Sequence, residues 1–187
     1  MRLNFFYYFW YKFLNSLFAG LSIGAVFVLY TPLKPSIFSI GGVLLALALL
    51  WVAKAYEKML NLRVFFWVTL FIEGVTLILI ISFLVFKYHY SNIVFVYALY
   101  QLTFVFGGYL IRMETLALKS AKALGLVDVV KQKGYLLGMA LSYLIYELLS
   151  FYGIEDKQIQ VYGMYWFLCL LQMGIIFFVV KSFRFFR

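Results

Sequence analysis

Six long apolar runs constrain the fold of this chain more than any other feature. They cover residues 13–30, 36–53, 62–86, 91–111, 134–151 and 159–180, and short polar stretches separate them. A helix needs about 20 apolar residues to cross a bilayer, with a range of roughly 17 to 25. The runs lack the apolar–polar alternation that is typical of a transmembrane barrel. The sequence therefore predicts an all-α polytopic membrane protein, a single domain over residues 1–187 with six transmembrane helices.

The composition agrees with a membrane protein and excludes other classes. Hydrophobic residues make up 66% of the chain and charged residues 12%, whereas soluble domains are about half apolar and a quarter charged. The single cysteine, Cys169, cannot form an internal disulfide, and the single histidine, His89, cannot build a metal cluster. We therefore expect neither a soluble domain nor a disulfide scaffold, and we expect no metal site and no cofactor.

The basic residues predict the orientation of the chain. Its formal net charge is +9, which in a soluble protein suggests nucleic acid binding but in a membrane chain more often reflects topology. If the N-terminus is cytoplasmic, thirteen Lys and Arg residues fall in inner segments and only Lys34, Lys87 and Lys157 in outer loops. This bias predicts that both termini are cytoplasmic. We expect a protein of a bacterial inner membrane, with the lipid bilayer and not nucleic acid as its partner.

Small residues recur at four-residue spacing in three of the runs. They are Ser16, Gly20 and Gly24 in the first, Gly42 and Ala46 in the second, and Gly134, Gly138 and Ser142 in the fifth. Such stripes allow helices to approach closely in a membrane. They predict close packing within the bundle, and the alternative is a face that slides or lines a ligand cavity.

Polar side chains gather near the middle of the spans. Ser22, Glu73, Gln101, Ser142 and Gln172 fall at nearly the same depth when each span is centred on the bilayer. A carboxylate at this depth costs about 2.5 to 3.5 kcal/mol on insertion scales. Glu73 is therefore either a protonated acid bonded to Gln101, Gln172 or a tyrosine, or a proton or cation coupling site. Glu147 lies nearer the outer surface and is the better candidate for contact with ligand.

The longest polar stretch, residues 112–133, has the pattern of an amphipathic helix. Apolar residues recur at helical spacing, while Arg112, Lys119 and Lys122 fall within a narrow arc. This pattern favours a helix on the cytoplasmic leaflet with its basic face toward anionic headgroups. The alternative is a cytoplasmic extension of the fourth span.

Motifs that support catalysis or gated conduction are missing from the sequence. There is no Gly-x-Ser-x-Gly, no His-Glu-x-x-His and no phosphate-binding glycine loop. There is also no arginine ladder of a voltage sensor and no Thr-Val-Gly potassium filter. We therefore do not expect an enzyme.

Three stretches resemble one half of a major facilitator superfamily transporter. The segment 16–24 is similar to the glycine-bearing first helix of that family. The loop 53–63 lies where the family keeps an acidic-then-basic signature, with Glu57, Lys58 and Arg63 as counterparts, and residues 128–137 resemble the charged start of its fifth helix.

The resemblance implies a fold and a mechanism. Members of the family have twelve spans in two halves that rock to give alternating access, so a six-span chain would have to work as a homodimer. Ser22, Gln101 and Glu147 would then contact ligand, whereas Glu73 and Gln172 would be structural.

These observations lead to the expectation of a secondary transporter for an unidentified small molecule or ion. The segments with Glu57, Lys58, Arg63, Arg112, Lys119 and Lys122 are candidates for a cytoplasmic gate or for lipid contact. Two alternatives stay open, a non-transporting subunit or scaffold of a larger complex and a small oligomeric channel.

Overall fold

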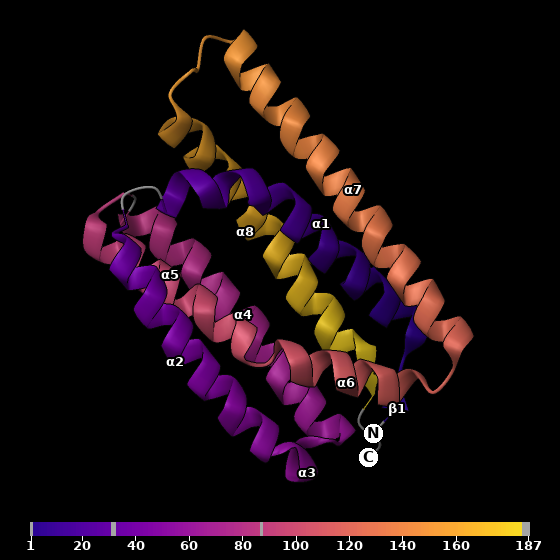
Figure 1. The fold of residues 1–187 in the computed structure, drawn as a ribbon. Coiled ribbons are helices and arrows are strands. Elements are labelled where there is room, and N and C mark those ends of the chain that lie inside the picture. Colours follow the sequence, from indigo (N-terminus) through magenta and orange to yellow (C-terminus); the bar gives the residue numbers. More distant parts are fainter. Residues whose placement is uncertain (1, 31–32, 87, 185–187) are drawn as a thin grey trace.

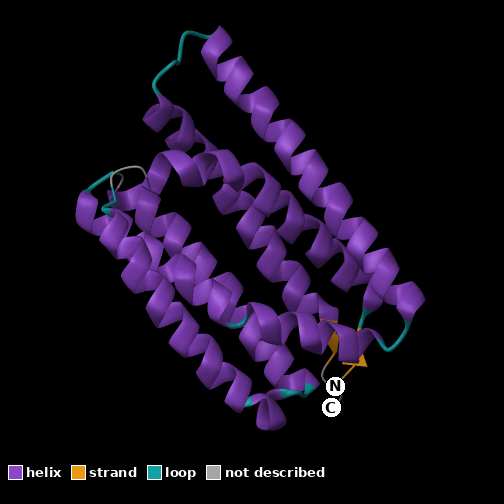
Figure 2. Cartoon of the chain, viewed as in Figure 1, coloured by secondary structure: helices purple, strands orange, loops and turns teal. Residues whose placement is uncertain are grey.

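The computed structural model describes residues 2–30, 33–86 and 88–184, and these are almost entirely helical (Figures 1 and 2). The elements are β1 (Arg2–Leu3), α1 (Phe5–Tyr30), α2 (Pro35–Lys54), α3 (Tyr56–Met59), α4 (Leu62–Phe86), α5 (Tyr90–Val105), α6 (Gly107–Leu118), α7 (Ala121–Phe151), α8 (Lys157–Ser182) and β2 (Phe183–Arg184). Six segments are long and apolar enough to span a membrane, namely α1, α2, α4, α5 together with α6, α7 and α8. The prediction of six apolar helices is confirmed.

The boundaries of two spans differ from the prediction. Helix α1 begins at Phe5 and not at residue 13, so Lys12 lies inside the helix and is buried. Helix α7 begins at Ala121 and not at residue 134. In each helix one lysine of the added part, Lys12 in α1 and Lys131 in α7, pairs with Glu114 inside the bundle, which the hydropathy of one segment does not reveal.

Residues 112–133 do not form one surface helix. Helix α6 ends at Leu118, where Lys119 adopts a left-handed conformation with a φ of 54° and donates its backbone N–H to the Thr115 carbonyl. Helix α7 begins two residues later, with Ser120 extended before it. A left-handed residue ends a helix in this way. Residues 112–118 therefore extend the fourth span, residues 119–120 form a tight turn, and the rest begins the fifth span, with Val127 buried in the bundle.

The fourth span is bent where α5 meets α6. Helix α5 ends at Val105, and Phe106 leaves the helical conformation with φ −98° and ψ 4°. Gly107 and Gly108 follow, and consecutive glycines weaken a helix because they lack a side chain to restrict the backbone. The bend brings the Tyr109 hydroxyl to the Met59 carbonyl, at 2.9 Å, so that α6 is fastened to the end of α3.

The six spans form an open row in the order α7, α1, α8, α4, α5, α2 (Figure 1). Each of these helices packs mainly on its neighbours in the row, and the two end helices each have one principal neighbour. The row has an internal symmetry. If the first, second and third spans are exchanged with the fourth, fifth and sixth, every pair of spans in main contact is replaced by another pair in main contact. Helix α2, at one end, has no buried residue.

Glycines form the seam between α1 and α7. An added Cβ at Gly20, Gly134 or Gly138 would lie within 3.0 Å of backbone atoms of the facing helix, and one at Gly24 would meet the ring of Tyr146. The packing predicted from these small residues is confirmed for α1 and α7. In α2 the prediction is wrong, because Gly42 faces open space and the neighbouring glycine packs on the fourth span instead.

Both termini lie at the same end of the bundle. Strands β1 and β2 pair antiparallel, with Arg2 opposite Arg184 and Leu3 opposite Phe183. Helix α3, the end of α6 and the start of α7 lie at this end too (Figure 1). Of the basic residues used to predict orientation, Lys87 and Arg187 lie outside the described residues. The others in the predicted inner segments belong to elements that meet at or near this end.

Candidate functional site

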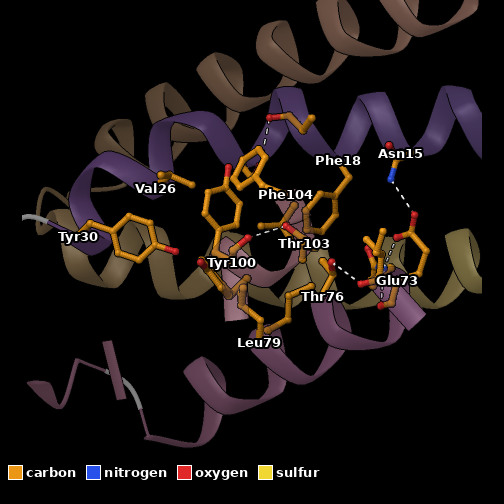
Figure 3. Close-up of a pocket in the computed structure, with 17 residues that line it drawn as sticks. Asn15, Phe18, Val26, Tyr30, Glu73, Thr76, Leu79, Tyr100, Thr103 and Phe104 are labelled. Atoms are coloured by element: carbon orange, nitrogen blue, oxygen red, sulfur yellow. Dashed lines mark hydrogen bonds between the residues drawn. The ribbon is translucent and has the colours of Figure 1, made fainter. Parts of the chain in front are cut away.

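A cavity lies between α1, α4, α5 and α8 and is the candidate functional site (Figure 3). Its volume is about 260 Å³. Helix α1 contributes side chains from Asn15 to Tyr30, so the cavity follows that helix for about four turns. Most of its lining is apolar or aromatic, and the one acid among the described lining residues, Glu73, lies with Asn15 and Gln172 at the end nearer the chain termini.

Glu73 is the centre of a buried hydrogen-bond network at that end of the cavity. Its carboxylate Oε1 accepts from the Tyr11 hydroxyl and from the Asn15 amide, both at 3.0 Å. Its Oε2 accepts from Gln172 Nε2 at 2.8 Å, and the same amide nitrogen lies 3.0 Å from the Glu73 carbonyl. Glu73 is 2% exposed and Gln172 fully buried. Two helices, α1 and α8, thus direct three donors at one acid on α4.

The geometry of the helices explains why these donors converge. Tyr11 and Asn15 are four residues apart on α1 and therefore lie on the same face of the helix. Glu73 lies in the middle of α4, and Gln172 extends from α8, which packs between α1 and α4. Of the partners that the sequence suggested for Glu73, Gln172 and a tyrosine are present, whereas Gln101 is not.

Gln172 keeps one atom without a partner. Its side-chain Oε1 is buried and accepts no hydrogen bond from any described residue. Buried polar atoms are nearly always paired in folded proteins. This unsatisfied acceptor lies beside the Glu73 carboxylate, on a residue that lines the cavity.

A second buried acid, Glu114 on α6, is held by two lysines. Glu114 Oε2 lies 3.2 Å from Lys12 Nζ on α1 and 2.9 Å from Lys131 Nζ on α7. Lys131 also reaches the exposed Asp128 at 3.3 Å. The Lys12 ammonium lies over the Tyr8 ring, 5.3 Å from its centroid, an arrangement that favours a cation. We call Lys12, Glu114, Lys131 and Asp128 the lysine cluster.

The sequence alone did not reveal the lysine cluster. Lys12 falls just before the first predicted span, which begins at residue 13, and Glu114 falls in the stretch 112–133 that was predicted to be an amphipathic helix. One signal in the sequence could have suggested the cluster. Glu114 is a single acid among apolar residues at helical spacing, and such an acid needs a basic partner. Nothing in the local pattern says which basic residue it meets.

The three predicted ligand contacts do not share a cavity within one chain. Ser22 lines the cavity near Glu73, and its hydroxyl donates to the Ala19 carbonyl. Gln101 lines a separate apolar groove between α2 and α5 and donates to the Tyr97 hydroxyl at 2.7 Å. Glu147 is exposed on α7.

The predicted polar layer divides among three places. Glu73 and Gln172 are in direct contact. Ser142 lies instead in the seam between α1 and α7, where its hydroxyl donates to the Leu21 carbonyl at 3.3 Å. Gln101 faces α2.

The residues predicted for a gate or for lipid contact lie near the end that carries the termini. Glu57 and Lys58 are exposed on the short helix α3, and Arg63 is exposed in the first turn of α4. The Arg112 guanidinium lies 5.6 Å from the centre of the Tyr56 ring. Lys119 and Lys122 flank the turn between α6 and α7 and are exposed.

The chain shows no significant match to models of protein families, to curated proteins or to solved structures. Within the described residues, no three His, Cys, Asp or Glu side chains converge in a way that could hold a metal ion. The candidate site is therefore defined by its own geometry, a largely apolar cavity that ends at one hydrogen-bonded acid inside an apolar helix bundle.

Proposed function

We propose that this chain is a secondary transporter of a small solute in a bacterial inner membrane and not an enzyme. In this proposal it works as a homodimer of half-size units by alternating access, with its termini in the cytoplasm. The order of the helices in the row carries the proposal. The cavity beside Glu73 adds to it, because a transporter needs a solute site between spans and away from lipid.

The row supports the proposal through its internal symmetry. The first, second and third spans occupy places equivalent to the fourth, fifth and sixth, since exchanging the two sets maps the main contacts onto one another. Two spans lie between each pair of equivalent spans, so equivalent spans run in opposite directions. Inverted repeats of this kind are typical of secondary transporters, including each six-span half of the major facilitator superfamily.

The two ends of the row support a second copy as the partner. Helix α2 buries none of its residues, and α7 relies mainly on α1. Two copies with the same orientation, related by an axis along the membrane normal, could cover these ends and enclose a central cavity. Ser22, Gln101 and Glu147 are our candidate solute contacts: Gln101 faces the end helix α2, Glu147 is exposed on the end helix α7, and Ser22 lines the cavity within each copy.

The subunit count of the purified protein in lipid nanodiscs, measured by native mass spectrometry, tests the proposal. We expect a homodimer. A monomer would contradict it and favour a subunit or scaffold that needs a different chain, and a larger ring would favour a channel.

Cysteine labelling tests alternating access directly. In a Cys169→Ala background, Ser22→Cys is expected to react with a membrane-impermeant maleimide from either side of the membrane. The control is Phe151→Cys, on an exposed residue at the far end of α7, which should react from one side alone. Labelling of the Ser22 position from one side alone would contradict alternating access.

A further inference from the structure

Five aromatic rings from α1, α5 and α8 line the cavity beside Glu73, and we call them the aromatic wall (Figure 3). They belong to Phe18, Tyr30, Tyr100, Phe104 and Tyr165. The Tyr30 and Tyr100 ring centroids are 6.1 Å apart, and those of Tyr100 and Phe104 are 4.8 Å apart with their planes nearly perpendicular. Aromatic faces carry partial negative charge and attract cations.

Glu73 is the only charged side chain among the described residues that line this cavity. The nearest basic residue along α1, Lys12, does not line it, and its ammonium pairs with Glu114 at 3.2 Å. The three donors on the Glu73 carboxylate are neutral groups. A carboxylate can accept about four hydrogen bonds, so it keeps capacity for one more partner.

The unsatisfied Oε1 of Gln172 lies at the same end of the cavity. Gln172 Oε1 lacks a donor, and the Glu73 carboxylate has no cationic side chain beside it in the cavity. Both atoms therefore favour a ligand that brings a positively charged or hydrogen-bond-donating group. An anion there would lie beside the Glu73 carboxylate and would be repelled by it. The lining also carries hydroxyl groups, on Ser22, Thr76 and Thr103 among others, but Glu73 is its only charged group among the described residues, so a cationic group gains the strongest attraction.

We propose that this cavity binds a monovalent organic cation, with its charged group beside Glu73 and its apolar body against the aromatic wall. This deepens the proposed function, on which it rests, by naming the class of solute. The Glu73 carboxylate supplies the attraction of opposite charges in a medium of low dielectric constant. The rings of Tyr100 and its neighbours supply cation–π contact and apolar surface.

Isothermal titration of benzyltrimethylammonium into the protein in nanodiscs tests this site. The probe carries one permanent positive charge on a small aromatic body and cannot donate a proton. Saturable binding is expected to the wild type, and phenylacetate, an anion of similar shape, should not compete. Glu73→Gln keeps the shape of the side chain but removes the charge, and we expect binding to weaken about tenfold or more.

Two matched controls separate charge from folding. Glu155→Gln removes an exposed acid in the loop between α7 and α8 and should leave the affinity unchanged. Tyr100→Leu leaves the hydrogen bonds of Glu73 intact and should weaken binding several-fold, so the proposal can be tested even if Glu73→Gln does not fold. Phe151→Leu, on an exposed aromatic residue, is the control for Tyr100→Leu.

Failure of this inference can be told apart from failure of the proposed function. No saturable binding of the probe, equal binding by Glu73→Gln, or effective competition by phenylacetate would overturn the cation site. A homodimer with no such binding would leave the proposed transporter in place. Binding that depends on Glu73 in a protein that is not a dimer would support the site and contradict the half-size transporter.

Discussion

The glycine seam between α1 and α7 predicts that the same change, glycine to alanine, destabilises the protein at one position of α7 and stabilises it at another. An added Cβ at Gly138 would lie within 3.0 Å of the Leu17 carbonyl, the Gly20 Cα and the Leu21 nitrogen. All three are backbone atoms, so no side-chain rotation can relieve the contact. We predict that Gly138→Ala forces the two helices apart and destabilises the protein.

The structure sets the size of this effect. Moving the backbones to ordinary contact distances requires a separation of about 1 Å, which forfeits a quarter to a half of the attraction between contacting atoms along the seam. Overpacking of this kind costs about 1–3 kcal/mol. Alanine recovers up to about 1 kcal/mol because it favours the helix over glycine. The net loss expected for Gly138→Ala is about 1–2 kcal/mol of the free energy of unfolding.

Gly125→Ala is the matched control, because it makes the same change in α7. A Cβ there meets no atom within 4 Å, so only the helix preference remains, and we expect a gain of about 0.5–1 kcal/mol. Adding Gly20→Ala to Gly138→Ala should cost less than the sum of the single changes, because the first change already separates the helices.

Thermal unfolding reported by thiol labelling measures these changes. Cys169 is the only cysteine in the sequence and is half-buried in α8, so its reaction with a fluorogenic maleimide reports loss of the bundle from a single position. Gly138→Ala should lower the unfolding temperature, and Gly125→Ala should not. If Gly138→Ala is as stable as Gly125→Ala, the close approach of α1 and α7 is wrong.

The same thermal assay tests three further predictions about buried polar groups. Glu114→Gln leaves two lysines without their shared acid and should lower the free energy of unfolding by about 3 kcal/mol. Asp128→Asn, on an exposed side chain, should change it by less than about 1 kcal/mol. Equal effects of the two variants would refute the importance of the buried pairs. Gln172→Leu removes a donor from the buried Glu73 carboxylate and should lower the free energy of unfolding by about 1–3 kcal/mol. Adding Glu73→Leu should restore part of that loss; simple addition of the two losses would contradict the contact. Ser82→Ala breaks a buried 2.6 Å hydrogen bond between α4 and α5 and should cost about 1 kcal/mol, so unchanged stability would count against that contact.

The sequence was sufficient where local patterns decide the structure. The length of the apolar runs determines six spans, because the bilayer thickness and the rise of a helix leave little choice. The small residues of the first and fifth spans predicted a close approach because a stripe at four-residue spacing lies on one face. Gly20 and Gly138 meet across that seam, as such stripes suggest.

The sequence was insufficient where contacts join distant spans. Lys12 reads as a flanking cytoplasmic residue because a positive charge lowers hydropathy, but its partner, Glu114, lies 102 positions later. Their depth predicted that Gln101 and Gln172 share one layer, yet Gln101 faces α2 whereas Gln172 faces Glu73 on α4. The depth of a side chain in the membrane follows from counting residues along its own helix. The neighbour that the side chain faces depends on how the helices are arranged around it, and the sequence of one span does not determine that arrangement.

Helix α1 connects the two buried acids to the seam with α7. Lys12 contacts Glu114, while Tyr11 and Asn15, within one turn of it, donate to Glu73. Farther along the helix, Gly20 packs on α7. Because consecutive turns of one rigid helix make these contacts, α1 cannot shift along its axis without changing the geometry around both acids and the seam together. A change of charge at Glu73 therefore acts on α1 and, through α1, on its packing against α7. A transporter needs such a connection if the binding of a solute is to move an end helix of the row.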